Sequence, residues 1–171
     1  MTQTTSPGRI VQINISPGGV PKLPVARAAL GPLGLDGDQH RDRRNHGGPT
    51  RALCLYGIEQ IRALQAEGHP IVPGAIGENL TTEGIDIGAL RPGDRLQIGD
   101  DILIEITGYT TPCQNIAPWF VDERIARVSA KVNPGWSRVY ARVLHGGVVY
   151  TGQPIRVPAP ATIEAGHDGG E

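Results

Sequence analysis

The residue best placed to do chemistry is Cys113, which follows Pro112 in the stretch YTTPCQNI, residues 109–116. This stretch comes directly after DILIEITG, an apolar run that is typical of a strand. Proline restricts the backbone before the cysteine, and polar residues stand on both sides of the pair. A thiolate at the end of a strand can act as a nucleophile or as a ligand for a soft metal. The local sequence alone also leaves a plain structural role open.

The other cysteine, Cys54, lies inside the apolar run ALCLY. Free cysteine is among the most buried residue types, so we expect Cys54 to be a small, unreactive core residue. Two cysteines this far apart predict neither a disulfide framework nor a metal-ligand pair.

The second candidate stretch is the basic segment GDQHRDRRNHGGPTR, residues 37–51. Its histidines, His40 and His46, suggest zinc only weakly, because no cysteine or third histidine has a matching spacing. The two glycines after His46 would let backbone N–H groups approach an anion, with the imidazole and Arg51 beside it. The segment is therefore either a solvated loop or a site that recognises phosphate.

The third stretch is PGAIGENL, residues 73–80, in which Glu78 and Asn79 follow Gly77. These two side chains either cap their own turn or offer an acceptor and an amide to the edge of a heterocycle.

Composition limits the classes of protein to consider. The 171 residues suffice for one domain, and 16 Lys and Arg against 17 Asp and Glu argue against a protein that coats nucleic acid. The 24 glycines and 15 prolines favour short strands joined by tight turns. Neither a run long enough for a membrane span nor a hydrophobic leader is visible, so we expect a cytoplasmic protein with reduced thiols.

The secondary structure that should position these residues is mainly β. One clear helix is expected over 57–67, where apolar residues recur at helical spacing before Gly68, and a second short helix over 121–132. We predict a closed, mostly antiparallel β-barrel of about six to eight strands, with one principal helix and short extra helices. Its domain should cover 9–158, between flexible ends. Strands are predicted over 9–15, over 51–56, over 96–98 paired with 102–106, and two or three times over 137–157.

The order of these motifs resembles that of the MOSC domain family, named for the C-terminal domain of molybdenum cofactor sulfurase. The matching pattern is GxxGDxH, HGGP, AxxxY, PGxxGENL, PGDRLQIG and then PC, and it is most similar to the small stand-alone bacterial members. The resemblance covers about residues 9–158. It implies a barrel related to the barrel domain of pyruvate kinase, and it implies binding of the molybdenum cofactor (molybdopterin), without a requirement for pyridoxal phosphate.

The resemblance also implies roles for single residues. Cys113 would ligate molybdenum and be the catalytic residue, and Lys22 would lie near the pterin phosphate. Two positions depart from the family pattern, because Thr111 and Gln39 stand where relatives often have basic residues. Phosphate or substrate contacts could therefore have moved to Arg51 or Arg142. The residues expected to bind the cofactor are Lys22, His46, Arg51, Glu78, Asn79, Thr111 and Arg142.

The resemblance implies an oxidoreductase that reduces N-hydroxylated compounds of the hydroxylaminopurine or amidoxime type. With two cysteines the chain cannot hold a four-cysteine iron–sulfur cluster, so a separate electron-donor protein is expected. We expect a monomer or homodimer that binds no nucleic acid and no membrane. Two alternatives stay open: a sulfur carrier with a persulfide on Cys113, and a non-catalytic barrel that only binds the cofactor.

Overall fold

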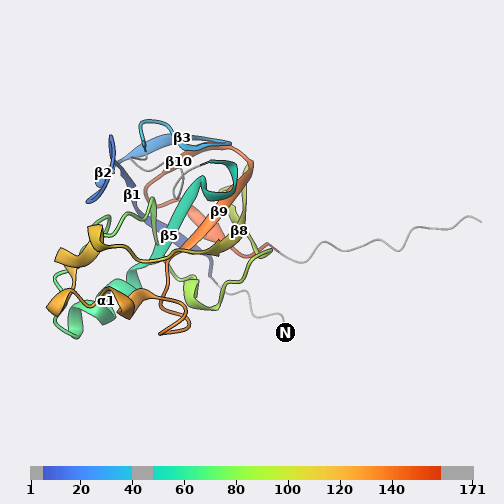
Figure 1. Ribbon diagram of the computed structural model, residues 1–171. Helices are drawn as coiled ribbons and strands as arrows, with labels where there is room; N and C mark the ends of the chain where they lie inside the picture. The colour runs from blue at the N-terminus through green and yellow to red at the C-terminus, as the bar shows by residue number, and fades with distance from the viewer. Residues whose placement is uncertain (1–5, 40–47, 159–171) are drawn as a thin grey trace, which may run out of the picture.

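Seven strands from the described residues, 6–39 and 48–158, close into a barrel in this computed structural model (Figure 1). The ring runs β11-β7-β8-β9-β5-β6-β1 and closes where β1 pairs with β11. Within it β5 and β6 run parallel, while the other neighbours are antiparallel, so the predicted fold class is confirmed. The ring strands are β1 (Gly8–Ile15), β5 (Leu53–Gly57), β6 (Leu80–Glu83), β7 (Arg95–Ile98), β8 (Ile102–Tyr109), β9 (Val139–His145) and β11 (Pro154–Arg156).

Strand β1 closes the ring because one of its edges serves two partners. Gly8 at its start pairs with Ile155 of β11, and Ile13 near its end pairs with Val25 of the short strand β2 (Leu23–Val25). A second sheet, β10-β3-β4, lies across the upper end of the barrel in Figure 1. Its strands are β3 (Arg27–Gly31), β4 (Gly34–Leu35) and β10 (Gly147–Tyr150).

Branched aliphatic side chains fill the barrel, since alternate residues of each strand point inward. None of the described residues in this buried cluster is aromatic, in keeping with an aromatic content of 4%. The cluster includes Ile10, Ile13, Leu53, Leu55, Ile104 and Ala141.

The predicted helix is α1 (Ile58–Ala66), which lies below the barrel in Figure 1. Its residues Ile58, Ile61 and Leu64 are buried in a second apolar cluster, together with Phe120 and Val128 from a later segment of the chain. The helix and that segment thus cover one end of the barrel.

The second predicted helix, over 121–132, is wrong as an α-helix. The chain there forms only short 3₁₀ turns, Val121–Glu123 and Ile125–Val128, and two residues of the first turn, Asp122 and Glu123, have positive φ. So short a segment gains little from helix propagation, and only Val128 of these two turns is buried. No helix among the described residues is long and apolar enough to cross a membrane. Of the predicted flexible ends, residues 1–5 and 159–171 lie outside the described part.

Gly74→Ala should destabilise the loop before β6, in which the Gly74 carbonyl accepts the N–H of Lys22. Gly74 has a φ of 84°, and a Cβ there would collide with the carbonyl oxygen of Lys22. We expect a loss of about 2–4 kcal/mol in the free energy of unfolding, measured by urea denaturation. Gly31→Ala is the matched control, because its φ is not positive and an added Cβ meets nothing within 4 Å. Equal losses in both variants would contradict this account.

Candidate functional site

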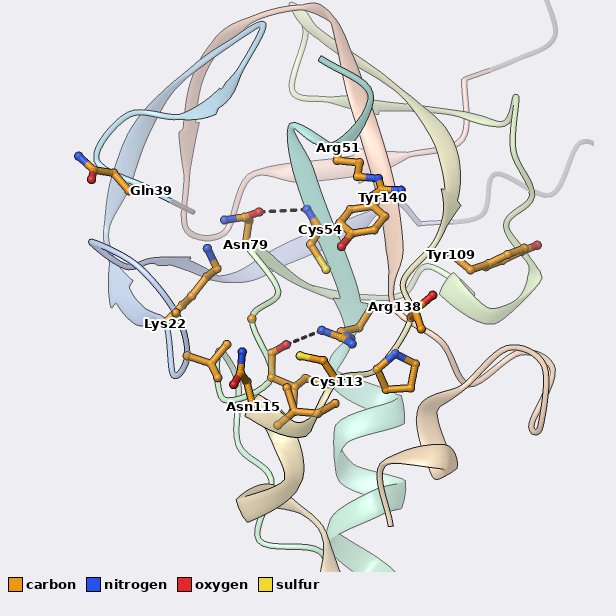
Figure 2. Close-up of a pocket in the computed structure, with 17 residues that line it drawn as sticks. Lys22, Gln39, Arg51, Cys54, Asn79, Tyr109, Cys113, Asn115, Arg138 and Tyr140 are labelled. Carbon is orange, nitrogen blue, oxygen red and sulfur yellow. Dashed lines mark hydrogen bonds between the residues drawn. The ribbon is translucent and has the colours of Figure 1, made fainter. Parts of the chain in front are cut away.

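A cavity of about 600 Å³ lies where the start of β9, the middle of β5 and three loops meet (Figure 2). The loops come from distant parts of the chain, around residues 19–22, 76–79 and 109–116. Of the predicted site residues, the cavity brings together Lys22, Arg51, Asn79, Thr111 and Cys113.

The other predicted site residues lie elsewhere or are not described. Glu78 is fully buried behind the cavity wall and does not line it. Arg142 lies on the outside of the barrel, where its Nε donates to Glu105 at 3.0 Å. His46 lies outside the described residues.

Cys113 is held by a local turn and not by the sheet. Strand β8 ends at Tyr109, and a 3₁₀ helix begins at Gln114, directly after the cysteine. The cysteine backbone is extended, with φ −124° and ψ 167°, and its carbonyl accepts the N–H of Ile116 at 3.1 Å. This arrangement leaves the thiol partly exposed, and Figure 2 shows it turned toward the cavity.

Cys54 is buried, at 7% exposure, but it also contributes to the cavity wall. Its neighbours Leu53 and Leu55 belong to the barrel core, so the pleat of β5 turns the intervening cysteine to the opposite face. Burial raises the pKa of the Cys54 thiol to about 11. A protonated thiol is a poor nucleophile, so the two cysteines of this cavity differ in chemistry.

The positive charge of Lys22 is already compensated. Its Nζ lies 2.6 Å and 2.8 Å from the two carboxylate oxygens of Asp38, and both side chains are buried. Asp38 also accepts hydrogen bonds from the N–H of Ser16, at 3.0 Å, and from Nδ2 of Asn79, at 2.9 Å. Asp38 belongs to the GxxGDxH pattern but was not among the predicted site residues, because its role depends on contacts with Ser16, Lys22 and Asn79.

Asn79 lines the cavity with an amide that is bonded to the protein. Its Oδ1 accepts the N–H of Cys54 at 3.0 Å, and its Nδ2 donates to Asp38 and to the carbonyl of Asn14, the latter at 3.3 Å. These bonds use the amide that was expected to face a heterocycle. The geometry therefore favours a positioning role for Asn79.

Glu78 acts within its own turn, the structural alternative left open by the sequence. One carboxylate oxygen accepts the N–H of Gly74, and Oε2 has no hydrogen-bond partner among the described residues. Burial raises the pKa of this carboxyl to about 8, although the Gly74 N–H and the charge of Arg138 oppose the shift. Glu78 is consequently mostly protonated at neutral pH.

Two cavity residues, Arg138 and Tyr140, were not predicted. Arg138 is 6% exposed, and its Nη1 donates to the carbonyl of Ile76 at 2.6 Å. Tyr140 pairs with Cys54 across β5 and β9, and burial raises the pKa of its phenol to about 12. The alternation of β9 did place both on one face with Arg142. That face borders the cavity only at the start of the strand, and Arg142 lies roughly 13 Å farther along.

The cavity wall is cationic. Lys22, Arg51 and Arg138 line it, whereas no Asp or Glu does so among residues 6–39 and 48–158. Arg51 also lies over the ring of Tyr140, with its Cζ 5.3 Å from the ring centroid. A concave site with one sign of charge attracts ligands of the opposite sign, so an anionic ligand is favoured.

The two thiols should react at very different rates in the folded, cofactor-free protein. Cys113 is partly exposed, whereas at pH 8 only roughly one Cys54 thiol in a thousand is a thiolate, given a pKa of about 11. Titration with a colorimetric disulfide reagent should show one fast equivalent, and Cys113→Ser should remove it. Fast labelling that persists in Cys113→Ser would reverse the assignment.

Glu78→Gln should make stability less dependent on pH. A carboxyl whose pKa rises from 4.5 to about 8 on folding binds a proton in the folded state only, so wild-type stability falls as pH rises through this range. The free energy of unfolding of the variant, measured in urea, should match that of the wild type near pH 5 and exceed it by a few kcal/mol at pH 9.

Glu67→Gln is the matched control for that series. The hydrogen bond from Arg127 holds the pKa of Glu67 below its usual value, so this carboxyl is ionised throughout pH 5–9. The effect of Glu67→Gln on the free energy of unfolding should therefore be the same from pH 5 to pH 9. A parallel pH trend in wild type and Glu78→Gln would show that Glu78 is not the titrating group.

The sequence is similar to a known domain family and to curated proteins. The sequence model of the MOSC domain matches residues 42–156. Protein YiiM of Escherichia coli (strain K12) is 31% identical over 138 residues, which are 77% of this chain and 60% of that protein. A protein named reductase from Gibberella moniliformis (strain M3125 / FGSC 7600) is 31% identical over 137 residues, 77% of this chain but only 23% of that protein.

The fold also has solved counterparts. The crystal structure of YiiM from Geobacillus stearothermophilus superposes with a TM-score of 0.65 at 27% identity, covering 90% of this chain and 76% of that one. The chain spans about 60% of the length of the Escherichia coli relative. The match to the family model over most of the barrel, together with these likenesses, shows that the chain belongs to the MOSC domain family.

Proposed function

We propose that the protein binds the molybdenum cofactor in this cavity, with Cys113 as the protein ligand to molybdenum, and reduces N-hydroxylated compounds such as hydroxylaminopurines or amidoximes. The observation that carries the proposal is the meeting of a partly exposed thiol and three cationic side chains in one cavity of about 600 Å³. Membership of the MOSC domain family supports the cofactor, and the relative named reductase supports the type of reaction.

The residues present fit such a cofactor. The cavity volume lies within the usual range for small-molecule sites, about 300–1,000 Å³. A pterin that carries a phosphate is anionic, and the cationic wall complements it. Arg138 lines the cavity, and its buried Nε–H has no hydrogen-bond partner among the described residues. Arg51 and Arg138 would hold the anionic groups, while Lys22 stays bound to Asp38 at the cavity wall, and Cys113 would supply a soft ligand to the metal.

The protein's own residues would bind and orient the cofactor and hold protons in the cavity. When bound, the cofactor supplies two-electron redox chemistry at molybdenum. Cys113 must lose its proton to act as a ligand, and the turn after Pro112 fixes its direction. Tyr140, with its raised pKa, keeps its proton at neutral pH and lines the cavity. Per substrate, two electrons from a separate donor protein and two protons convert the N–OH group to N–H and one water.

The proposal is tested by metal and pterin analysis of protein made in a cofactor-replete host. Molybdenum and pterin at about one per chain, with reduction of an amidoxime by a chemical electron donor, would support it. Protein that carries a persulfide and lacks molybdenum would favour the sulfur carrier. Bound cofactor without turnover would favour the barrel that only binds it.

Cys113→Ser should remove reduction while it leaves the fold intact. Serine keeps the size of the side chain, but its hydroxyl is much harder to deprotonate, so the metal loses its anionic sulfur ligand. We expect a loss on the order of 10³-fold or more in turnover with an amidoxime, together with a lower molybdenum content and unchanged circular dichroism.

Cys54→Ser is the matched control for this variant. It should keep its activity and lose some stability, because it places a hydroxyl in a buried strand. Full activity of Cys113→Ser at full molybdenum occupancy would rule out the cysteine as the ligand.

A further inference from the structure

Arg138 is a buried cation on the cavity wall with little to compensate it. Only 6% of the residue is exposed, and within residues 6–39 and 48–158 its side chain makes one hydrogen bond, from Nη1 to the carbonyl of Ile76. Its Nε–H is buried and has no partner in the part of the chain that the structure describes. A guanidinium does not lose its proton in proteins, so the charge cannot be removed by a pKa shift.

The surroundings of Arg138 differ from those of the cations that form ion pairs. Lys22 is bound by Asp38, Arg127 by Glu67, and both Arg95 and Arg142 by Glu105. Within the described ranges, no carboxylate forms an ion pair with Arg138, although it is more deeply buried than Arg95 or Arg142. A buried charge without a partner is unfavourable, which points to a ligand that supplies the opposite charge.

The acid near Arg138 does not supply that charge at neutral pH. Glu78 is fully buried, and its Oε2 also lacks a hydrogen-bond partner among the described residues. Because burial raises the pKa of Glu78 to about 8, the carboxyl is mostly neutral near pH 7. Among the described residues, the charged and titratable groups that act on it electrostatically include Arg138 just before β9, Lys22 before β2, and Cys54 and Tyr56 on β5.

We infer that Arg138 forms a binding site for one oxyanion group inside the cavity, and that Glu78 takes up a proton when the anion binds. A guanidinium presents parallel N–H donors that match the oxygens of a phosphoryl, carboxylate or metal-oxo group. Thr111 and Asn115 line the same cavity and can add neutral hydrogen bonds. The positive field of Arg138 favours the ionised form of Glu78. An anion placed at Arg138 cancels part of that field, and the carboxyl then holds its proton more tightly.

This linkage fixes the direction of the pH dependence. Glu78 is protonated well below pH 8, so an anion entering there meets an uncompensated Arg138. Well above pH 8, Glu78 is ionised and competes with the ligand for the field of the guanidinium. Anion affinity should therefore fall as pH rises through about 8. The site and its linkage concern the cofactor-free chain, so they can hold or fail independently of the proposed reduction.

The test is calorimetric titration of the cofactor-free full chain with sulfate and, separately, with molybdate. Neither dianion changes its protonation between pH 6.5 and 9.5, so a pH effect belongs to the protein. We expect one saturable site, about tenfold weaker binding at pH 9.5 than at pH 6.5, and a net proton uptake near pH 8 when buffers of different ionisation enthalpy are compared. Absence of saturable binding by the wild type would overturn the inference.

Three variants separate the site from a general effect of charge. Arg138→Gln should weaken binding at pH 6.5 at least about tenfold. Arg142→Gln removes an arginine of β9, four residues farther along the chain and outside the cavity, and should leave binding unchanged. Glu78→Gln should bind the anion with no pH dependence and no proton uptake, since the amide oxygen can still accept the Gly74 N–H.

The outcomes test the roles of Arg138 and Glu78 and distinguish the class of oxyanion that binds. Equal binding by wild type and Arg138→Gln, or an unchanged pH dependence in Glu78→Gln, would overturn the inference. If Arg138→Gln does not fold, the wild-type and Glu78→Gln titrations still decide it. Molybdate bound more than tenfold tighter than sulfate supports the site as one for a metal-oxo group. Similar or reversed affinities support it as one for a phosphoryl or carboxylate group.

Discussion

The cavity depends on one buried amide, that of Asn79. Strands β5 and β6 run parallel from the pair Leu55 and Leu80, so Cys54 and Asn79 stand where this ladder gives way to the cavity. Backbone groups at such a point would be left unpaired and buried. The Asn79 side chain accepts the N–H of Cys54, and the Asn79 N–H donates to the Cys54 carbonyl at 2.8 Å. The barrel can therefore open on this side without orphaned backbone donors.

The same amide determines which cation is available to a ligand. Asn79 donates to Asp38, and Asp38 binds both the N–H of Ser16 and the ammonium of Lys22. Lys22 is thus fixed and neutralised in one network. Arg138 approaches the cavity from the residue before β9, and its side chain is hydrogen-bonded to the carbonyl of Ile76. A wall that looks uniformly basic by composition therefore contains one cation bound by a carboxylate and one buried cation with no carboxylate partner among the described residues.

Local sequence patterns predicted what depends on local geometry. Alternation and turn residues indicated the barrel, and the spacing of Ile58, Ile61 and Leu64 predicted α1. The position of Cys113 after Pro112 left its role open, and the resemblance to the MOSC domain family assigned it to the site, where it lines the cavity. The patterns failed where contacts across the sequence decide the outcome. Asp38, although part of the GxxGDxH pattern, and Arg138 were not predicted as site residues, since their roles arise from partners 16 to 62 residues away. The segment 121–132 had helical spacing, yet its turns bury too little to sustain a helix.

The position of Cys113 beyond the strand follows from a constraint that Cys54 illustrates. A residue within a ladder has its backbone committed to two neighbours and its side-chain direction fixed by the pleat. Cys54 reaches the cavity only as part of its wall, in surroundings that raise the pKa of its thiol. Cys113 comes four residues after β8 ends, between a proline and a 3₁₀ helix, so a rigid turn sets its direction independently of the sheet. A thiol that must meet a ligand can be placed from such a turn, because the barrel core does not have to reshape around it.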